Sequence, residues 1–277
     1  MSQVSQQEYQ MFREFLQDSC GILLGDNKAY LVNSRLKPVL QNNSISSMGD
    51  LVASLKRPSS QKLREQVINA MTTNETLWFR DTHPYDILKN RIFAELTEKN
   101  KNTPINIWSA ACSTGQEPYS ISMIAKEFLE TRGGKLKQEF KVVATDISSR
   151  VLDNAKSGVY QMLALGRGMS DHRLKKFFTK VNDDSWGLQN QIKDMVQFKP
   201  LNLMESYQSI GSNFDIVFCR NVLIYFSPEL KKQILIKMHK SLKKGGYLIL
   251  GASESLNGLS DHYEMIQCRP GIIYRAI

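Results

Sequence analysis

The stretch that decides the fold is Ile105-Asn-Ile-Trp-Ser-Ala-Ala-Cys-Ser-Thr-Gly-Gln-Glu117, in which a short β-rich run passes into a turn of small residues. The apolar residues that follow are spaced as on one face of a helix: Ile121, Ile124, Ala125 and Phe128. The next β-rich run, Phe140–Asp146, precedes a short helix that Ser148 can cap and Gly158 can end. This alternation predicts βαβ units, and therefore a parallel sheet covered by helices on both faces.

The rest of the C-terminal part continues the alternation. Further strands are expected at Met195–Phe198, Phe214–Cys219 and Gly246–Gly251. Between the last two, Ser227-Pro228-Glu229 opens a helix that we expect to end at Gly245-Gly246. The two runs on either side of Arg269-Pro270-Gly271 indicate an antiparallel hairpin. By analogy, such a hairpin at the end of a doubly wound sheet is typical of class I methyltransferases.

Residues 1–72 predict helices only and form a small all-α domain. Apolar side chains repeat at helical spacing in three stretches, which hold Tyr9, Phe12, Phe15 and Leu16, then Leu31–Leu40, then Leu63, Val67, Ala70 and Met71. Pro38 is expected to kink or end the middle helix. We expect a linker over residues 73–103 and the sheet domain over residues 104–277, with a small insertion at about 161–194.

The composition of the 277-residue chain is that of a globular protein, with 42% hydrophobic and 23% charged residues. Apolar runs such as Val222–Phe226 are far shorter than the ~20 residues of a membrane-spanning helix, and the N-terminus lacks the features of a signal peptide. The four cysteines form no C-x-x-C pair and no Cys/His cluster, which disfavours a disulfide framework or a zinc site. We expect a cytoplasmic protein with no metal and no membrane insertion.

The net charge of +9 indicates a polyanionic partner. The segment from Lys28 to Arg64 contains seven Lys or Arg residues and one acidic residue, Asp50. This one N-terminal segment therefore carries a net charge of +6. Nucleic acid, an anionic membrane surface and an acidic protein face all fit such a charge, and a solvated helical surface is the simplest interpretation.

Ligands of doubly wound sheets bind beyond the carboxyl ends of the strands, so the residues there are the candidates for a site. Glu117, after the first strand, is placed to meet a positive group, and the turn before it is neither G-x-G-x-x-G nor a Walker motif. Asp146, after the second strand, either holds a ribose diol or caps the next helix.

The later strand ends carry amides and an arginine. Asn202-Leu203 offers an amide for an adenine edge beside an apolar wall. Burial of Arg220, Asn221 and Tyr225 at a strand end costs free energy unless their polar groups contact a ligand or each other. An asparagine at such a position is, however, often a turn residue. The segment Met71–Arg80 is rich in hydrogen-bonding groups followed by aromatics, and a capped helix is the alternative interpretation.

Taken together, these motifs resemble the CheR-type chemotaxis receptor methyltransferases over essentially the whole chain. The motifs, in order, are Thr-Thr-Asn-Glu-Thr at 72–76 with Phe79-Arg80, Trp108–Ser120, Ala144–Ile147, Asn202-Leu203 and Phe218–Phe226. The departures are Leu77-Trp78, where the family usually has another residue and Phe, and Pro38 in the basic helix.

The resemblance implies transfer of a methyl group from S-adenosylmethionine to glutamate side chains of chemoreceptors, leaving S-adenosylhomocysteine. Arg80 and Tyr225 match positions that act on the reacting groups, and Arg35 and Lys37 are candidates for contact with the cytoplasmic helical region of the receptor. The implied cofactor contacts are Asn74, Thr76, Arg80, Glu117, Asp146, Asn202, Leu203, Arg220 and Asn221.

Two other function classes fit parts of the sequence. A nucleic-acid methyltransferase fits the charge, but the N/D-P-P-Y signature is missing and no aromatic-interleaved basic stretch occurs, so no nucleic acid is expected. A cofactor-binding sensor without turnover is disfavoured by Arg80 and Tyr225. Some relatives tether themselves to a receptor peptide through the insertion, and the stretch Phe178–Phe198 is short for that role, which favours direct binding.

Overall fold

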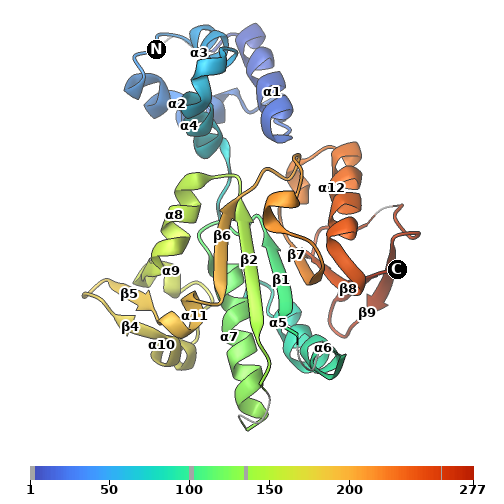
Figure 1. Cartoon of the computed structure of the whole chain (residues 1–277). Helices are drawn as coiled ribbons and strands as arrows, with labels where there is room; N and C mark the ends of the chain where they lie inside the picture. The colour runs from blue at the N-terminus through green and yellow to red at the C-terminus, as the bar shows by residue number, and fades with distance from the viewer. Residues whose placement is uncertain (1–3, 100–102, 134–136, 257) are drawn as a thin grey trace.

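The computed structural model describes residues 4–99, 103–133, 137–256 and 258–277. An all-helical N-terminal domain lies beyond one end of the strands of a larger sheet domain (Figure 1). Its elements are α1 (Gln6–Cys20), α2 (Ala29–Asn42), α3 (Met48–Leu55), the 3₁₀ helix η1 (Pro58–Ser60) and α4 (Gln61–Met71). Phe12, Leu16, Leu36 and Leu51 are fully buried in the core that these helices share. The expected all-α domain is confirmed.

Local signals account for the start and end of α1. Ser5 accepts a hydrogen bond from the backbone of Glu8, whose side chain accepts one from the backbone of Ser5, so the helix begins with a capping box. It ends at Gly21, which adopts a left-handed φ of 76° that favours glycine. In α2 the expectation about Pro38 was wrong in one respect, because the helix continues past Pro38 to Asn42. Burial of Val39 and Leu40 beyond the proline offsets the lost hydrogen bond.

The sheet domain is built on seven strands in the order β6-β2-β1-β7-β8-β10-β9. The first five are parallel, and β10 pairs antiparallel with both β8 and β9. The bounds are β1 (Ile105–Ala110), β2 (Phe140–Asp146), β6 (Val196–Pro200), β7 (Phe214–Cys219), β8 (Leu242–Leu250), β9 (Tyr263–Gln267) and β10 (Ile272–Ala276). This is the doubly wound, mostly parallel sheet with a terminal hairpin that the sequence predicted.

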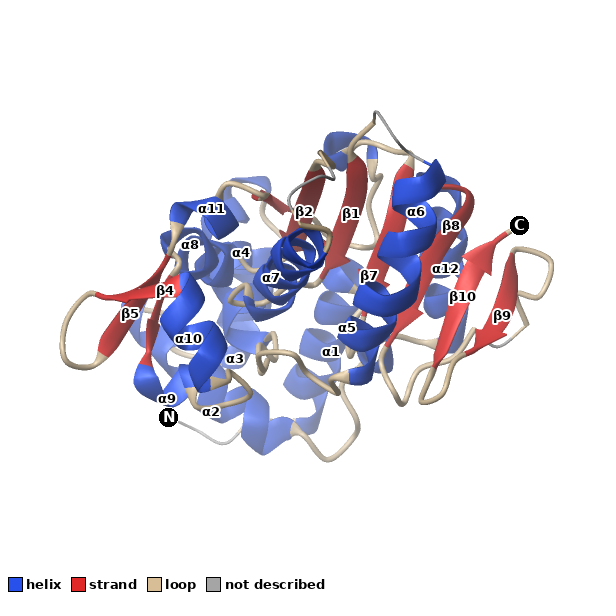
Figure 2. Ribbon diagram, turned by 90° about the horizontal axis from the view of Figure 1, so that it is seen from below, coloured by secondary structure: helices blue, strands red, loops and turns tan. Residues whose placement is uncertain are grey.

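Helices cover both faces of this sheet (Figure 2). Ile105 and Ile107 of β1 face a core shared with α7 (Gln116–Thr131), whereas Trp108 faces a second core shared with α12 (Pro228–Ser241). The alternation of side chains along one buried strand therefore serves two different layers. The shorter helices are α8 (Ser149–Ser157) and the 3₁₀ turns η3 (Gln208–Ile210) and η4 (Leu223–Tyr225).

Residues 73–103, which the sequence predicted as a linker, carry α5 (His83–Ile87), the π-helix η2 (Leu88–Ile92) and α6 (Phe93–Lys99). Trp78, Tyr85 and Phe93 are buried in the same core as α7 and the sheet. The described part of this segment thus packs as a layer of the sheet domain.

The boundary between α12 and β8 corrects one expectation. The helix ends at Ser241, and Gly245-Gly246 lie inside β8 rather than at the helix end. The pairing with β7 shifts register here, from Phe214 opposite Leu242 to Ile216 opposite Tyr247. Gly245 supplies a φ of +78° in this irregular stretch, so the glycines accommodate a bulge instead of a helix terminus.

The insertion has its own small sheet, and we call residues 159–193 the insertion subdomain (yellow-green to yellow in Figure 1). Its three antiparallel strands have the order β3-β5-β4. Its elements are β3 (Val159–Gln161), α9 (Met162–Leu165), α10 (Asp171–Phe177), β4 (Phe178–Lys180), β5 (Ser185–Leu188) and α11 (Asn190–Lys193). Across the described ranges, no helix is both long and apolar enough to cross a lipid bilayer.

Candidate functional site

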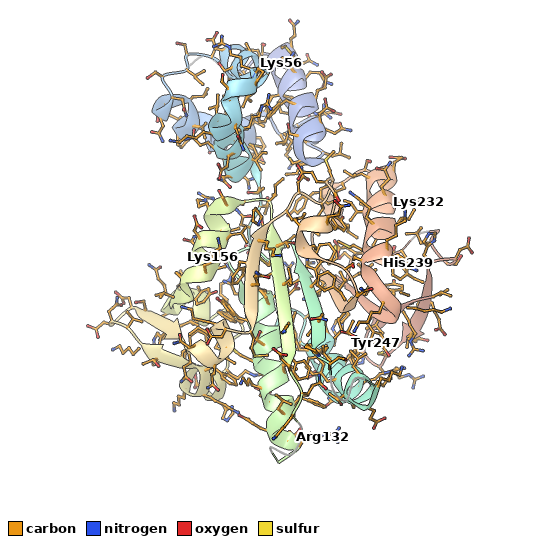
Figure 3. The ribbon with its side chains drawn as sticks, in the orientation of Figure 1. Lys56, Arg132, Lys156, Lys232, His239 and Tyr247 are labelled. Carbon is orange, nitrogen blue, oxygen red and sulfur yellow. The ribbon has the colours of Figure 1, made fainter. Side chains whose placement is uncertain are left out.

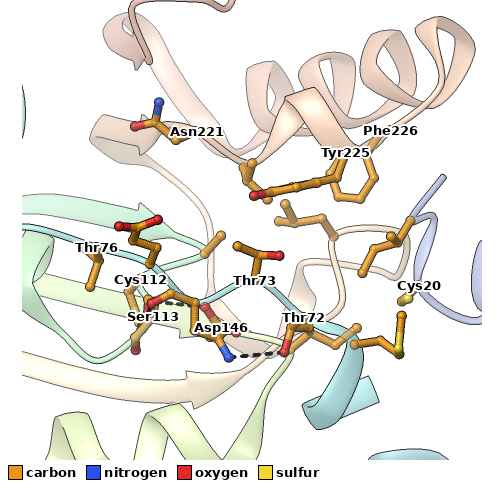
Figure 4. Close-up of a pocket in the computed structure, with 18 of the residues that line it drawn as sticks. Cys20, Thr72, Thr73, Thr76, Cys112, Ser113, Asp146, Asn221, Tyr225 and Phe226 are labelled. Atoms are coloured by element: carbon orange, nitrogen blue, oxygen red, sulfur yellow. Dashed lines mark hydrogen bonds between the residues drawn. The ribbon is translucent and has the colours of Figure 1, made fainter. Parts of the chain in front are cut away.

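A cavity of about 320 Å³ opens at the carboxyl ends of the parallel strands. Its wall combines the ends of β1, β2 and β7, the segment 71–77, and the loop 20–25 of the helical domain (Figure 4). A volume of this size suits a small-molecule ligand. All the predicted cofactor and catalytic residues line it: Asn74, Thr76, Arg80, Glu117, Asp146, Asn202, Leu203, Arg220, Asn221 and Tyr225.

Glu117 stands in the first turn of α7, where the helix dipole favours a carboxylate. It accepts hydrogen bonds from the hydroxyl of Ser109 at 2.8 Å and from Arg220 at 3.3 Å. Burial raises the pKa of Glu117, and the charge of Arg220 opposes that rise. The site therefore holds a largely buried anion whose charge is only partly compensated.

Asp146 ends β2 and ties two loops together. Its two carboxylate oxygens accept backbone N–H groups, from Ser113 at 2.8 Å and from Ser148 at 3.0 Å. Burial raises the pKa of Asp146, and these backbone hydrogen bonds lower it in part. Ser148 is the N-cap residue of α8, as expected, although its hydroxyl makes no capping hydrogen bond and its backbone N–H donates to Asp146.

The turn after β1 approaches the segment that carries Asn74. Ala111 and Ser113 have left-handed φ angles of 57° and 51°, and Gly115 has a φ of 92°. This sharp path lets the Ser113 hydroxyl donate to the carbonyl of Asn74 at 2.7 Å. The amide of Asn74 donates to Thr72 at 3.2 Å, a contact drawn in Figure 4. The turn after β1 is therefore hydrogen-bonded to the segment that leads to Arg80.

Arg80 lies in a strained stretch of backbone. Phe79, Asp81 and Thr82 have φ angles of 49°, 66° and 44°, a region that costs a non-glycine residue roughly 1–3 kcal/mol. The Arg80 side chain reaches the cavity and forms no ion pair or hydrogen bond with any residue that the structure describes. It is an uncommitted cation on the wall of the cavity that Glu117 and Asp146 also line.

Arg220, in contrast, is bound by protein groups at both of its terminal nitrogens. Its side chain is 2% exposed and one terminal nitrogen donates to the carbonyl of Arg80 at 3.0 Å and to Asp81 at 2.7 Å. The other terminal nitrogen donates to Glu117. Its Nε is buried and has no partner among the described residues. Arg220 thus organises the strand end through its two terminal nitrogens.

The loop after Arg220 depends on Glu254, which the sequence analysis missed. The carboxylate of Glu254 accepts four backbone N–H groups, from Asn221 and Gly251 on one oxygen and from Val222 and Leu223 on the other, at 2.8–3.0 Å. Asn221 has a left-handed φ of 60°, as expected for a turn residue. Only the polarity of Glu254 shortly after the strand end at Leu250 could have signalled this role.

Asn202 and Leu203 contribute a wall rather than a free amide. The Asn202 amide donates to the carbonyl of Ser19 at 2.8 Å, and its oxygen accepts from the backbone of Met204 at 3.0 Å. Leu203 is buried, and its carbonyl accepts from Lys237 at 2.7 Å. Asn202 therefore joins the helical domain to the sheet domain as well as lining the cavity.

The helical domain closes one side of the site, which the sequence did not predict. The loop after α1 lines the cavity, and the N–H of Leu23 donates to the carbonyl of Tyr225 at 2.9 Å. Arg35 also lines the cavity, but it donates to the carbonyl of Met71 at 2.7 Å. Lys37 is exposed outside the cavity wall, as is Lys56 on the far side of the helical domain (Figure 3).

Metal ligation has no support in the described ranges, where no cluster of three or more His, Cys, Asp or Glu side chains is arranged to hold an ion.

Comparison with known proteins adds to this geometry. Residues 74–272 match the family model described as CheR methyltransferase, SAM binding domain, and residues 7–72 match CheR methyltransferase, all-alpha domain. The chain is 53% identical over 271 residues to chemotaxis protein methyltransferase 1 of Pseudomonas aeruginosa, over 97% of both chains. It is 52% identical over 269 residues to chemotaxis protein methyltransferase Cher2 of Pseudomonas putida, over 97% of this chain and 98% of that one. Identity to chemotaxis protein methyltransferase 1 of Vibrio cholerae is 49% over 272 residues and 98% of each chain.

Proposed function

The chain belongs to the CheR methyltransferase family, and from that membership we propose that it esterifies glutamate side chains of chemoreceptors. The family makes it a chemotaxis protein methyltransferase that uses S-adenosylmethionine. The proposal adds the acceptor, a carboxylate on the cytoplasmic helical region of a methyl-accepting receptor. It also assigns the individual residues of the cavity to roles in the transfer.

The polar groups on the cavity wall fit S-adenosylmethionine. Glu117 is an anion suited to the ammonium group, and Asp146 keeps lone pairs free for the two ribose hydroxyls. The unpartnered Nε of Arg220 suits the carboxylate of the methionine part. Leu203 and the amide-bearing Asn202 form the wall for the adenine. Asn74, Thr76 and Asn221 supply the remaining polar lining.

One observation carries the assignment of the acceptor, namely the uncommitted Arg80 guanidinium in the same cavity as Glu117 and Asp146. A cation without a partner at a site for a positively charged cosubstrate is unfavourable unless an anion also enters. A glutamate side chain of the receptor is such an anion, and a guanidinium binds carboxylates in a fixed, two-pronged geometry. Arg80 therefore orients the acceptor.

The chemistry asks little else of the protein. S-adenosylmethionine supplies a methyl group made electrophilic by its sulfonium sulfur. A glutamate has an ordinary pKa near ~4.3, so the acceptor is already ionised at neutral pH and needs no general base. The protein must align the carboxylate and remove its water. Tyr225 lines the cavity on the side opposite the β2 end, where its hydroxyl can fix the geometry of the acceptor.

The test is transfer from radiolabelled S-adenosylmethionine to receptor-bearing membranes, followed by mild alkali. Label released as methanol means a carboxyl methyl ester and supports the proposal. Alkali-stable label on protein or on added nucleic acid would contradict it, since esters alone hydrolyse under these conditions. Membranes that lack methyl-accepting receptors serve as the control and should take up no alkali-labile label.

A further inference from the structure

The backbone around Arg80 cannot hold its own conformation. Three of its near neighbours, Phe79, Asp81 and Thr82, adopt left-handed φ angles, which bulky and β-branched residues rarely do. Such a conformation persists only where surrounding contacts fix it. The contacts on each side of Arg80 therefore determine where its guanidinium points.

On the C-terminal side the contacts come from the site itself. Arg220 donates to the carbonyl of Arg80 and to the carboxylate of Asp81. These bonds hold the main chain at Arg80, but they leave the aromatic residues before it unaccounted for.

On the N-terminal side the backbone N–H of Phe79 donates to the hydroxyl of Ser120 in α7 at 3.2 Å, and further contacts come from the insertion subdomain. The ring of Trp78 packs edge-on between Tyr160 and Phe178, with centroids 4.9 and 5.6 Å away. The backbone N–H of Trp78 donates to the carbonyl of Arg167 at 3.1 Å. The backbone at Gly168 approaches so closely that a Cβ there would lie 2.1 Å from the carbonyl oxygen of Trp78. The subdomain thus forms the wall against which this segment is seated.

Arg173 of α10 contacts Phe79, the residue directly before Arg80. Its guanidinium carbon lies 3.9 Å from the centroid of the Phe79 ring, well inside the range of a cation–π contact. Two of its nitrogens donate to the two carboxylate oxygens of Glu127 in α7, at 2.7 and 3.1 Å, so the guanidinium plane is fixed (α10 lies beside α7 in Figure 2). The Phe79 ring also makes an edge contact with the ring of Tyr85, with the two centroids 5.4 Å apart.

The anchor for Arg173 is itself well defined. Glu127 is mostly buried and also binds Lys89 at 3.2 Å. Burial raises the pKa of Glu127, but the hydrogen bonds and charges of Arg173 and Lys89 outweigh it and hold that pKa below its ordinary value. The carboxylate is therefore ionised at neutral pH and keeps Arg173 over the ring.

We propose that Arg173 is a positioning residue for methyl transfer, through which the insertion subdomain fixes Phe79 and with it the orientation of Arg80. The proposal rests on the role of Arg80 given under the proposed function. It makes the insertion part of the support of the active site, in addition to any contact that the subdomain makes with a receptor.

The structure offers a matched control. Lys176 lies one turn after Arg173 on α10 and pairs with Glu130, one turn after Glu127 on α7. The two ion pairs join the same helices, but the ring under Lys176 is that of Phe177, whereas the ring under Arg173 is that of Phe79. Arg173→Gln and Lys176→Gln therefore remove equivalent charges, and Arg173→Lys keeps the charge while it loses the planar stack.

The experiment compares receptor methylation by the full-length variants, with kcat and the KM for S-adenosylmethionine measured separately. We expect Arg173→Gln to lower kcat about tenfold with KM within about twofold, because a small misplacement of an orienting group slows transfer without weakening binding. Arg173→Lys should recover part of the loss, and Lys176→Gln should match the wild type. Equal kcat for the two Gln variants would overturn the proposal.

A second readout does not require the receptor substrate. Amide hydrogen exchange over residues 78–82 should accelerate in Arg173→Gln and stay at the wild-type rate in Lys176→Gln, with melting temperatures recorded for both. Unchanged exchange in Arg173→Gln would refute the positioning role. A wild-type protein that fails to methylate receptors while the exchange result holds would instead refute only the proposed acceptor.

Discussion

Arg220 lies 3.3 Å from Glu117, and this pair joins the carboxyl end of β7 to the first turn of α7. Both side chains are removed from water, at 2% and 13% exposure, so each depends on the other for its charge. The sequence suggested that both bind the cofactor. In the structure Arg220 donates hydrogen bonds to Glu117, to Asp81 and to the carbonyl of Arg80. It thereby holds the anion Glu117 and the main chain of the cation Arg80 at the end of the same strand.

Replacement of Arg220 by Met is expected to destabilise the protein as well as its ligand site. It leaves Glu117 and Asp81 without their cation, and loss of one partner of a buried pair costs about 3–5 kcal/mol. Urea denaturation should show that loss in the free energy of unfolding. Arg173→Gln is a useful comparison, since its ion pair is more exposed. A loss below about 1 kcal/mol would mean that water replaces the Arg220 contacts.

The affinity for S-adenosylhomocysteine should depend on pH in the acidic range. Burial raises the pKa of both Glu117 and Asp146, so their protonation, and the loss of binding with it, begins at a higher pH than for an ordinary carboxylate. Protonation of these two carboxyl groups does not itself unfold the protein, because a carboxyl with a raised pKa binds its proton more tightly in the folded state than in the unfolded chain. Calorimetric titrations with S-adenosylhomocysteine at a series of acidic pH values measure how its Kd depends on pH. Glu117→Gln should weaken binding at neutral pH and flatten the profile, and an unaltered profile would contradict the role of Glu117.

Replacement of Arg80 by Ala should separate turnover from cofactor binding. We expect kcat for receptor methylation to fall about 100-fold, as for a misplaced reactant, while the Kd of S-adenosylhomocysteine changes less than threefold, about the effect of a small change in packing. Radiolabel transfer and calorimetry give the two quantities. Arg80→Lys keeps the charge but loses the two-pronged geometry, and should lie between. Equal losses in both quantities would make Arg80 a cofactor clamp.

The Glu254→Gln substitution tests the support of the loop that leads to Tyr225. The amide nitrogen of Gln cannot accept hydrogen bonds, so two of the four backbone N–H groups lose their acceptor, at a cost of roughly 1–3 kcal/mol each when buried. The melting temperature and kcat should both decrease. Glu264→Gln, on the exposed hairpin, is the control and should change neither. Full activity of Glu254→Gln would show that the loop holds its shape without the carboxylate.

Charge reversal should distinguish the two basic residues of α2. Lys37 is exposed, so Lys37→Glu should slow receptor methylation at low salt and leave the affinity for S-adenosylhomocysteine unchanged. Arg35→Glu should also weaken that affinity, because Arg35 holds the carbonyl of Met71 at the cavity wall. Lys56→Glu, on the far side of the domain, serves as the control. If Lys37→Glu and Lys56→Glu have the same activity, the segment around Lys37 is only a solvated face.

Local periodicity accounts for the part of the fold that could be predicted. Apolar spacing located the helices of the N-terminal domain, and the alternation after Pro104 identified the parallel sheet and its hairpin. Where that signal was ambiguous, the observed ends of elements differ from the predicted ones. Gly245, predicted to end α12, lies inside β8 because the register against β7 requires a bulge there. Pro38 showed the same limit, since tertiary burial carried the helix past a local breaker.

The sequence by itself determined which residues stand at the strand ends, because parallel strands bring their carboxyl ends to one edge, and Glu117, Asp146 and Arg220 therefore had to meet. Only the tertiary structure decided what each one contacts. Leu23 closes the cavity on Tyr225, Glu254 binds a loop some thirty residues earlier, and Arg173 reaches Phe79 from the insertion. Hydrogen bonds and ring contacts between distant segments leave no periodic trace in the sequence, since they depend on how finished elements pack.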